Sequence, residues 1–430
     1  MENERSVFMN KYDLIVVGGG FAGFGAAVAS AREGLKVLLI ERTNALSGAA
    51  NSNLVMPFMP YRTSMVDENG GKYYKYLSRG IFEEVVERLT DAGRSDKFNF
   101  DNEYLKLVLN RMAIDAGVNL LFNATVISAV REGDRVKSVT VYGKGKTYEL
   151  EADYFIDATG DANLIAMTGF PFRVGREQDS LCQPMTLCFR VAGVNEKEFF
   201  ELYRKGAINE RYKALKAEGK IRNPREDVLV FRVLTDGMLH FNTTRVVKLD
   251  PTDIFAVTKA EIEAREQVYE MLDFLKSEFE CFKNAHIAST AVEIGTRESR
   301  MIDGEYTIRG NELKTCPRYD DSIAVGNYDI DIHNPEGSGT SHYYFPQGEY
   351  YEIPYRTLIP KNAENLLVAG RCISADHEAQ ASIRIMPIVC TLGQAAGTAI
   401  AIAKRDKTNV KSVNIPELQQ KLIDNGAVIH

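Results

Sequence analysis

The segment YDLIVVGGGFAGFGAAVASAREGLKVLLIER, residues 12–42, constrains the fold more than any other part of the chain. Residues 14–17 are an apolar, partly β-branched run, as expected for a strand buried in a parallel sheet. A glycine turn with the spacing GxGxxG follows, then an alanine-rich helix over residues 24–32 and a second apolar strand over residues 36–40. This order predicts the first βαβ unit of a dinucleotide-binding sheet.

Each glycine of the turn has a separate physical role. Gly18 permits the tight turn, Gly20 lets the backbone approach a pyrophosphate, and Gly23 lets the helix lie close to the strand. The first N–H groups of the helix and its positive dipole end attract phosphate. Glu41 ends the second strand, where a carboxylate can accept hydrogen bonds from both ribose hydroxyls of adenosine. A lone GxGxxG is a weak signal, but the strand, the helix, the second strand and the terminal Glu41 around it together predict a bound dinucleotide.

Two later segments favour FAD over NAD as that dinucleotide. Residues 118–161 read as a run of strands and turns that ends in YFIDATGD, and residues 365–372 (NLLVAGRC) form another apolar strand that breaks at a glycine. A simple NAD-dependent dehydrogenase has no need to return to its nucleotide domain so late in the chain. A flavoprotein does, because the ribityl chain and the flavin ring extend past the pyrophosphate and require a second wall. We therefore expect FAD as the cofactor.

Seven segments occur in one order along nearly the whole chain: VVGGGFAG, AGVNLLFNATV, IDATGDANL, QPMTLCFRV, EIGTRESRMIDGEY, DIHNPEGSG and IPYRTLIPKNAENLLVAGRCISADHEAQASIRIMPIVCTLGQAAG. In them the chain resembles the FAD-dependent oxidoreductases of the glutathione-reductase-like superfamily, and within it a bacterial family related to fumarate reductase flavoproteins and thiamine-thiazole synthases. The resemblance implies an α/β protein with a Rossmann-type FAD-binding domain of three layers (ββα) and an inserted α+β substrate domain. The predicted boundaries are 10–165 and 326–405 for the two parts of the FAD-binding domain, 166–325 for the substrate or cap domain, and 406–430 for a C-terminal helix or tail.

The resemblance also implies which residues would contact FAD. They are Gly18, Gly20, Phe21, Ala22 and Gly23 at the pyrophosphate, Glu41 and Arg42 at the adenosine ribose, Val126 at the adenine, Ala158, Thr159 and Gly160 along the nucleotide, and Gly370, Arg371, Pro387 and Ile388 around the flavin. The chain departs from related flavoproteins in two places. LSGAANSN (residues 46–53) replaces a Gly-Gly pair, and Gly370–Arg371 replaces a Gly-Asp pair whose Asp would contact the ribityl chain. The ribityl contacts of this chain are therefore expected to differ.

The apolar segment near the C-terminus predicts a long buried helix over residues 387–404. Pro387 suits a first helical turn, where its missing N–H costs nothing. The resemblance implies that the free N–H groups would face the anionic edge of a reduced flavin. Gly393 and Gly397, one turn apart, would let the helix lie close to the nucleotide-binding layer. The longest apolar run, residues 388–403, is too short and too often interrupted by Gly, Thr and Gln to span a bilayer, so no membrane contact is expected.

Four residues are candidates for catalysis, and each has a structural alternative. Arg384, just before the helix, could clamp a substrate anion or donate a proton as in the fumarate reductase relatives; the alternative is a salt bridge to Glu378 or a contact with an FAD phosphate. His377 could be a general acid or base, or a hydrogen-bonded structural histidine. His333 and His342 have the same two interpretations, and the family motif favours His333.

Several other side chains are interpreted mainly as structural. Arg297, Glu298 and Arg300 in GTRESR are expected to form a buried charge network between the domains, with anion binding as the alternative. Cys372 beside Arg371 could have a lowered pKa, although a buried thiol fits better. Tyrosines and a phenylalanine near residue 350 could line a substrate cavity, but aromatic residues belong more often to a core. These are Tyr343, Tyr344, Phe345, Tyr350, Tyr351 and Tyr355.

The middle of the chain has no further dinucleotide motif. Residues 184–194 and 227–247 read as strands of a sheet that would cover the flavin. Residues 253–282 read as a long amphipathic helix, with Ile254, Val257 and Ile262 among its apolar positions at helical spacing.

Composition excludes several classes of partner. The net charge of −7 comes from 52 basic and 59 acidic residues spread evenly, so neither nucleic acid nor an anionic membrane surface is an expected partner. The six cysteines form no CxxC pair, as expected for free thiols in a reducing cytoplasm. No His/Cys cluster has the spacing of a structural metal site. The opening MENERSVFMN has acidic residues and no apolar core, unlike a secretory signal. We expect a cytoplasmic protein without a metal.

The expected function is that of an FAD-dependent oxidoreductase, a dehydrogenase or reductase that transfers a hydride between the flavin and a small organic substrate, with an anion as a favoured class. Because no second GxGxxG unit is found, electrons would come from the substrate, from free NAD(P)H, or from a donor or acceptor protein. Two alternatives are a flavoprotein subunit that relays electrons within a complex and an FAD-dependent RNA-modifying enzyme, which the acidic net charge disfavours. The sequence is compatible with an oligomer.

Overall fold

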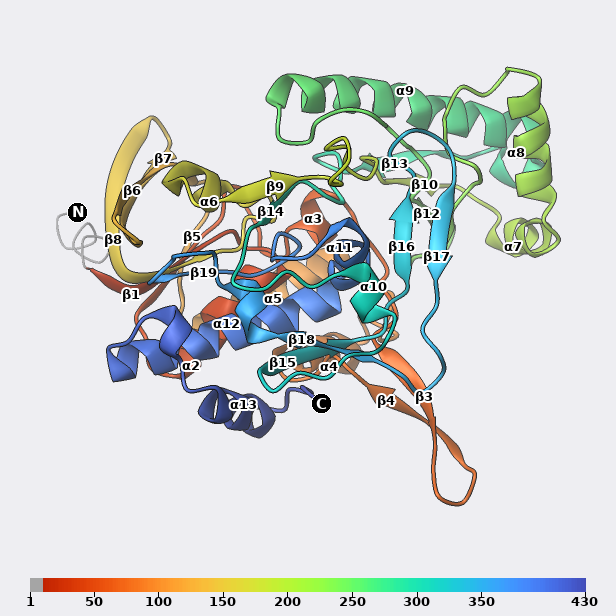
Figure 1. Ribbon diagram of the computed structural model, residues 1–430. Coiled ribbons are helices and arrows are strands. Elements are labelled where there is room, and N and C mark those ends of the chain that lie inside the picture. Colours follow the sequence, from red (N-terminus) through yellow and green to blue (C-terminus); the bar gives the residue numbers. More distant parts are fainter. Residues whose placement is uncertain (1–10) are drawn as a thin grey trace.

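A seven-stranded sheet organises the larger part of the protein, whose computed structural model describes residues 11–430 (Figure 1). The strands are β1 (Tyr12–Val17), β2 (Val37–Ile40), β5 (Asn119–Leu121), β6 (Thr125–Glu132), β7 (Arg135–Gly143), β8 (Lys146–Asp157) and β19 (Leu366–Val368). The parallel part has the order β5, β2, β1, β8, with β19 also parallel to β8. β8 is long: its first half pairs with β7 in an antiparallel meander, and its second half pairs with β1 and β19.

Three strands from distant parts of the chain end at the same edge of this sheet. Val17 of β1 and Val368 of β19 both pair with Asp157, the last residue of β8. The loops that follow parallel strands at their carboxyl ends form the crevice in which such sheets bind ligands. The topology therefore brings the glycine turn, the ATGD turn and the AGRC turn together, as the sequence motifs require.

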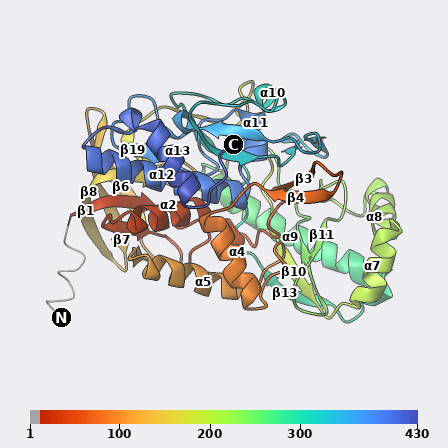
Figure 2. The same ribbon diagram turned by 90° about the horizontal axis from the view of Figure 1, so that it is seen from below.

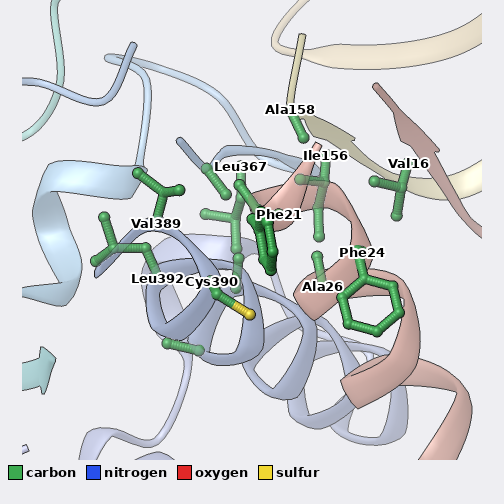
Figure 3. Close-up of a cluster of buried hydrophobic side chains, with 14 of the residues drawn as sticks. Val16, Phe21, Phe24, Ala26, Ile156, Ala158, Leu367, Val389, Cys390 and Leu392 are labelled. Atoms are coloured by element: carbon green, nitrogen blue, oxygen red, sulfur yellow. The ribbon is translucent and has the colours of Figure 1, made fainter. Parts of the chain in front are cut away.

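Two helices cover one face of the parallel strands: α2 (Phe21–Arg32) and α12 (Met386–Asp406). They lie side by side in Figures 1 and 2, although one is near each end of the chain. Figure 3 shows Phe21 and Ala26 of α2 in one apolar cluster with Leu392 of α12. Glycines make this close approach possible, because a Cβ on Gly393 would lie 2.0 Å from the Ala22 carbonyl oxygen and one on Gly397 would lie 2.2 Å from that of Ala26.

Replacing Gly397 by leucine is expected to lower the free energy of unfolding by about 3 kcal/mol or more, because the side chain would be forced into backbone atoms of α2. The measurement is chemical denaturation followed by circular dichroism. Gly71→Ala is the control, since its Cβ would meet only the exposed side chain of Asp67. Equal stability of the two variants would contradict the close helix contact.

A four-stranded antiparallel sheet carries the second apolar core, at the end of the molecule away from α13 in both views (Figures 1 and 2). Its order is β11, β12, β10, β13. The elements of this unit are β10 (Phe189–Ala192), β11 (Val230–Arg232), β12 (Met238–Phe241), β13 (His286–Thr290), α7 (Glu196–Arg204), α8 (Ala207–Ala217) and α9 (Ile254–Glu278). The strands are shorter than the segments 184–194 and 227–247 from which they were predicted, and the antiparallel sheet completes the mixed α/β architecture.

This second core extends from Met185 to Ile294. The boundaries drawn from the sequence, at residues 166 and 325, lie outside it at both ends. Phe170, Ile302 and Ile323 pack in the first core with the parallel sheet. The segment after residue 294 therefore returns to the FAD-binding side well before residue 325.

The buried face of α9 differs from the prediction. Ile254 and Ile262, which were expected on the buried face, are 74% and 63% exposed. In its first half the helix instead buries the small residues Ala256, Ala260 and Ala264. Its second half buries Val268, Met271, Leu272 and Leu275 as the apolar spacing predicted, so the predicted face is wrong only near the N-terminal end.

The remaining elements are short. The strands form four pairs: β3 (Arg62–Val66) with β4 (Lys72–Tyr76), β9 (Phe172–Val174) with β14 (Arg300–Ile302), β15 (Ser322–Gly326) with β18 (Tyr351–Pro354), and β16 (Ile330–His333) with β17 (Thr340–Tyr343). The helices are α3 (Ala49–Ser52), α4 (Ile81–Asp91), α5 (Asn102–Asp115), α6 (Asn163–Thr168), α10 (Gly310–Leu313), α11 (His377–Ile383) and α13 (Ile415–Asp424). The segment just before α12 is mostly the helix α11. Asp376 caps it by accepting a hydrogen bond from the Ala379 N–H at 2.8 Å.

Of the helices described in residues 11–430, one, α12, has the length and hydropathy of a membrane span, and its apolar window is entirely buried inside the protein. The prediction of a buried helix is confirmed, with the helix beginning at Met386 rather than Pro387. Two predictions concern residues outside the described part of the chain. One is that the opening MENERSVFMN is not a signal segment, and the other is that the FAD-binding domain begins at residue 10.

Candidate active site

A cavity of about 670 Å³ opens at the carboxyl edge of the parallel sheet and extends to the second core. One end is lined by the turns after β1, β2 and β8. The other end is lined by residues of the second core and of the β16–β17 hairpin, and Arg384 and Met386 stand between α11 and α12. The cavity therefore has a nucleotide end and an end enclosed by polar and charged side chains.

The glycine turn fits a pyrophosphate. Gly18 has φ of +103°, and a Cβ there would lie 2.4 Å from the Ala158 carbonyl oxygen; a Cβ on Gly23 would lie 1.8 Å from the Gly18 oxygen. A Cβ on Gly20 would meet nothing nearer than 3.9 Å, so this position faces open space in the cavity that it lines. No side chain caps the N-terminus of α2, which leaves its first N–H groups available to an anion.

Glu41 is fixed before any ribose arrives. Its Oε2 accepts a hydrogen bond from the Gly19 N–H at 2.7 Å, and its Oε1 accepts from the N–H and the hydroxyl of Thr43, both at 2.8 Å. The carboxylate lines the cavity. Beside it, Arg42 reaches across the cavity mouth and pairs with Glu293 of the second core. This ion pair joins the two halves of the protein at the nucleotide end.

Most of the other predicted FAD contacts also line the cavity: Phe21, Ala22, Val126, Ala158, Thr159, Gly160, Gly370 and Arg371. Arg371 forms an ion pair with Asp161 at 2.5 Å. Pro387 and Ile388 are not among the lining residues, whereas Ile385, Met386 and Val389 are. Met386 and Val389, three residues apart, share the face of α12 that lines the cavity, whereas Pro387 and Ile388 lie on another face and are buried.

Asp157 was missed, although it organises the ATGD turn. Its buried carboxylate accepts hydrogen bonds from the Thr159 N–H, the Thr159 hydroxyl and the Ile165 N–H at 2.7–3.0 Å. A polar residue at the end of an apolar strand, directly before Ala-Thr-Gly, was the signal in the sequence. Asp157 holds the backbone of residues 158–160 at the cavity without lining it.

At the far end of the cavity three side chains converge on one carboxylate oxygen, Asp331 Oδ2. The Tyr328 hydroxyl donates to it at 3.1 Å, His333 Nε2 lies 3.3 Å away, and Arg384 Nη2 lies 3.4 Å away. All four residues line the cavity. Burial alone would raise the pKa of the Asp331 carboxyl, but the His333 hydrogen bond and the charges of Arg384 and Arg297 lower it well below its usual range. Asp331 is therefore a carboxylate.

Both ring nitrogens of His333 have hydrogen-bond partners. Its Nδ1 lies 3.0 Å from Arg245 Nη2 and 3.2 Å from the Thr340 hydroxyl. A guanidinium only donates, so Nδ1 accepts and Nε2 carries the proton that bonds to Asp331. Burial and the positive charge of Arg297 lower the pKa of His333 well below its usual range. His333 is thus a neutral imidazole that positions Asp331.

Arg297 has only neutral partners. Its Nη1 donates to the Pro184 carbonyl and to the Thr186 hydroxyl, both at 2.7 Å, and its Nη2 donates to Asn242 at 3.4 Å. Among the ion pairs of residues 11–430, none includes Arg297. Burial and the nearby charge of Arg384 lower the pKa of Arg297 to about 9, so it still carries its charge at neutral pH.

His377, predicted as a catalytic residue, does not line the cavity. Its Nδ1 lies 2.8 Å from Oε1 of the fully buried Glu298, whose Oε2 accepts from the Gln183 N–H at 2.9 Å. The structure therefore brings Arg384 and His333 together and pairs His377 with Glu298. The charge network predicted for GTRESR is reduced to this one contact, because Arg297 and Arg300 donate only to neutral groups. Arg384 pairs with Asp331, while Glu378 pairs with Lys314 at 2.9 Å.

Other sequence expectations can be placed as well. None of the six predicted aromatic residues near residue 350 lines the cavity, whereas Tyr328, which was not predicted, does. All six cysteines are free. Burial raises the pKa of Cys372 to about 12, so the lowered value suggested by its neighbour Arg371 is wrong. Within residues 11–430, the side chains of Asp329, Asp331 and His342 are close enough to share a metal ion, but they already compensate one another's charges together with Arg384.

Comparison with known proteins places this geometry in a family. Residues 13–422 match the family model described as FAD dependent oxidoreductase. The chain belongs to the FAD-dependent oxidoreductase family. It is an oxidoreductase with FAD as its cofactor, and the glycine turn, Glu41 and the open space at Gly20 fit that group.

Individual relatives resemble the chain over parts of their length. The chain is 27% identical to digeranylgeranylglycerophospholipid reductase 1 of Methanococcoides burtonii over 35% of its own length and 38% of the relative. It is 26% identical to a thiamine thiazole synthase of Methanococcus vannielii, over 36% of its length and 58% of the relative. The chain thus spans well under two thirds of the curated relatives that it matches.

Solved structures are similar over more of the chain but at lower identity. The p-nitrophenol 4-monooxygenase PnpA of Pseudomonas putida superimposes with a TM-score of 0.47 at 11% identity, over 93% of this chain and 82% of that chain. A geranylgeranyl bacteriochlorophyll reductase-like protein of Thermoplasma acidophilum superimposes with a TM-score of 0.45 at 11% identity, over 96% of this chain and 83% of that chain.

Proposed function

We propose that this FAD-dependent oxidoreductase transfers a hydride between FAD and a small organic anion bound at Arg297 and Arg384. The single observation that carries the proposal is that Arg297, a charged side chain lining the cavity, has only neutral partners.

The charges around the far end of the cavity do not balance. Arg245 pairs with Glu226, and Arg384 shares the carboxylate of Asp331 with neutral His333. Arg297 then contributes a further positive charge. A charge held away from water is costly unless it is paired. A carboxylate or phosphate of a substrate would supply the missing negative charge, and the planar guanidinium suits two-point binding of such a group.

The same residues determine which side chain holds the proton used in the reaction. When bound, FAD accepts or donates the hydride. Burial and the charge of Asp331 raise the pKa of Tyr328 well above its usual range, so Tyr328 keeps its proton and can donate it to a substrate atom. Arg297 and Arg384 hold the anion, while Asp331 and His333 fix the position of the Tyr328 hydroxyl. Free NAD(P)H or a partner protein would serve the second half of the cycle.

The chain also matches a tRNA uridine modification enzyme MnmG of Finegoldia magna, at 22% identity over 46% of this chain and 32% of the relative. That similarity is too partial to support a second proposal. The cavity residues named above favour a small anion.

The test is an anaerobic reduction of the holoenzyme by defined compounds, followed by bleaching of the flavin absorbance. The panel pairs lactate, malate, succinate and glycerol 3-phosphate with the methyl esters or amides of the acids and with glycerol, and includes NADH and NADPH as separate arms. We expect at least one anion to bleach the flavin and its uncharged partner to do so at least about 30-fold more slowly, since removing one partner of a buried charged pair costs about 2–5 kcal/mol. Equal rates for charged and uncharged partners would overturn the proposal.

A further inference from the structure

A row of polar side chains leads from the protein surface to the cavity along the β16–β17 hairpin. Asp329, Asp331 and His333 alternate with isoleucines in the sequence DIDIH, so they share one face of the strand. Across the hairpin, Asp331 pairs with His342 and His333 pairs with Thr340. Directly opposite residues of an antiparallel pair lie on the same side of the sheet.

His342 is the outer end of this row. Its side chain is 37% exposed, its Nδ1 lies 2.5 Å from Asp329 Oδ2, and its ring stacks on Tyr344 with the centroids 5.5 Å apart. The same nitrogen lies 3.8 Å from Asp331 Oδ1. The imidazole therefore touches water on one side and faces two carboxylates on the other.

Asp331 connects the outer end to the cavity through its two different oxygens. Asp331 is only 7% exposed, and its Oδ1 is buried, faces His342 and has no hydrogen-bond partner. Oδ2 accepts from the hydroxyl of Tyr328, a residue that lines the cavity. A buried carboxylate oxygen without a donor is unusual and calls for an explanation. A proton that arrives there from His342 would provide the missing donor.

We propose that His342, Asp331 and Tyr328 form a proton path between solvent and the substrate end of the cavity, with His342 as its entry. The proposal rests on the function proposed above. In the oxidising direction an acid loses a hydride to bound FAD and a proton to the Tyr328 oxygen, while the Tyr328 proton moves to Asp331 Oδ2. A half-turn of the carboxyl about its Cβ–Cγ bond, a torsion with two broad minima, then presents this proton to His342, which releases it to water.

The path balances the reaction in both directions. Each substrate oxidised sends one hydride to bound FAD and one proton to solvent, and a reduction would draw one proton inward by the same steps. Imidazole is the side chain that gains and loses protons most readily near neutral pH. Asp329 is a second hydrogen-bond acceptor for the His342 ring. The ring can therefore lose its contact with Asp331 and stay in the same position. His342 and Asp331 act through Tyr328 and are positioning and relay residues.

The test compares His342→Ala with His286→Ala, a control that removes another exposed histidine, on β13 of the second core. Holoenzyme is reduced anaerobically in stopped flow with the compounds of the panel above. His342→Ala is expected to reduce the flavin about 100-fold more slowly, at the lower end of the range that positioned proton transfer contributes. It should also show a larger solvent deuterium isotope effect, and added imidazole should restore the rate. His286→Ala should match the unchanged protein.

The outcomes separate the two proposals. Rapid reduction of the unchanged protein by an anion, together with an unchanged rate and isotope effect in His342→Ala, would overturn the proton path and leave the anion site standing. A slow His342→Ala variant that imidazole does not rescue would show a structural effect and would also overturn the path. If no anion in the panel reduces the flavin of the unchanged protein, the anion site fails, and the path fails with it.

Discussion

Replacing Gly20 by valine is expected to give a folded protein that contains no FAD. The backbone of Gly20 has φ of −66°, which valine adopts without strain, and a Cβ there meets no atom within 3.9 Å. The isopropyl group would instead project into the cavity in front of the uncapped N-terminus of α2. FAD affinity should fall at least about 100-fold, because each tenfold loss needs only about 1.4 kcal/mol of lost contact. The measurement is the FAD released on denaturation per mole of protein, with thermal unfolding as the check on folding.

Gly337→Val is the matched control for this variant. A Cβ at Gly337 also has nothing within 4 Å, but this glycine lies in the turn of the β16–β17 hairpin and does not line the cavity. It should retain FAD. Full FAD content in Gly20→Val would mean that the pyrophosphate does not approach this turn.

Replacing Arg297 by methionine is expected to remove most of the activity toward an anionic substrate while leaving FAD in place. Methionine can fill part of the space of the aliphatic stem, but it provides neither charge nor donors to the cavity. Removing one partner of a buried charged pair costs about 2–5 kcal/mol, so kcat/KM for the anion should fall roughly 30-fold to 5000-fold. The loss should be much smaller for an uncharged analogue of the same substrate. Anaerobic flavin reduction with both compounds measures the difference.

Arg225→Lys is the control for the loss of a buried arginine. Arg225 is 5% exposed, pairs with Asp227 at 3.3 Å and does not line the cavity. Its replacement should affect stability more than substrate discrimination. If Arg297→Met discriminates between charged and uncharged substrates as the unchanged protein does, then Arg297 is not the anion site.

The nucleotide end of the cavity could be predicted from the sequence because its determinants are local. Gly18, Gly20, Gly23 and Glu41 belong to one strand-turn-helix-strand unit, in which spacing alone fixes the geometry. Three of the predicted contacts do not line the cavity: Gly23, Pro387 and Ile388. Gly23 lies against Gly18 and Ala158 instead. Successive side chains of a helix point about 100° apart, so Pro387 and Ile388 lie on another face of α12 than the lining residues Met386 and Val389.

The substrate end was harder to predict because it depends on contacts between distant segments. His377 and His333 looked equivalent in sequence, yet Glu298 holds His377 outside the cavity while Asp331 and Arg245 hold His333 at it. The anion-binding alternative for Arg297 could not be weighed without knowing that its partners would all be neutral. The alternation DIDIH was the available signal for Asp331, and its meaning depended on which side of the hairpin faced the cavity.

The packing of α12 against α2 has a consequence for how the protein acquires its cofactor in a cell. On the ribosome, α2 and the glycine turn are made early, and the AGRC turn and the start of α12, which complete the cavity, are made among the last segments. Until then the alanine-rich surface of α2 has no partner, and contacts between segments so far apart form slowly. A nascent chain can therefore hold FAD firmly only after translation has passed Val389. A pause before that point would leave the apolar surface of α2 exposed to aggregation or to chaperone binding.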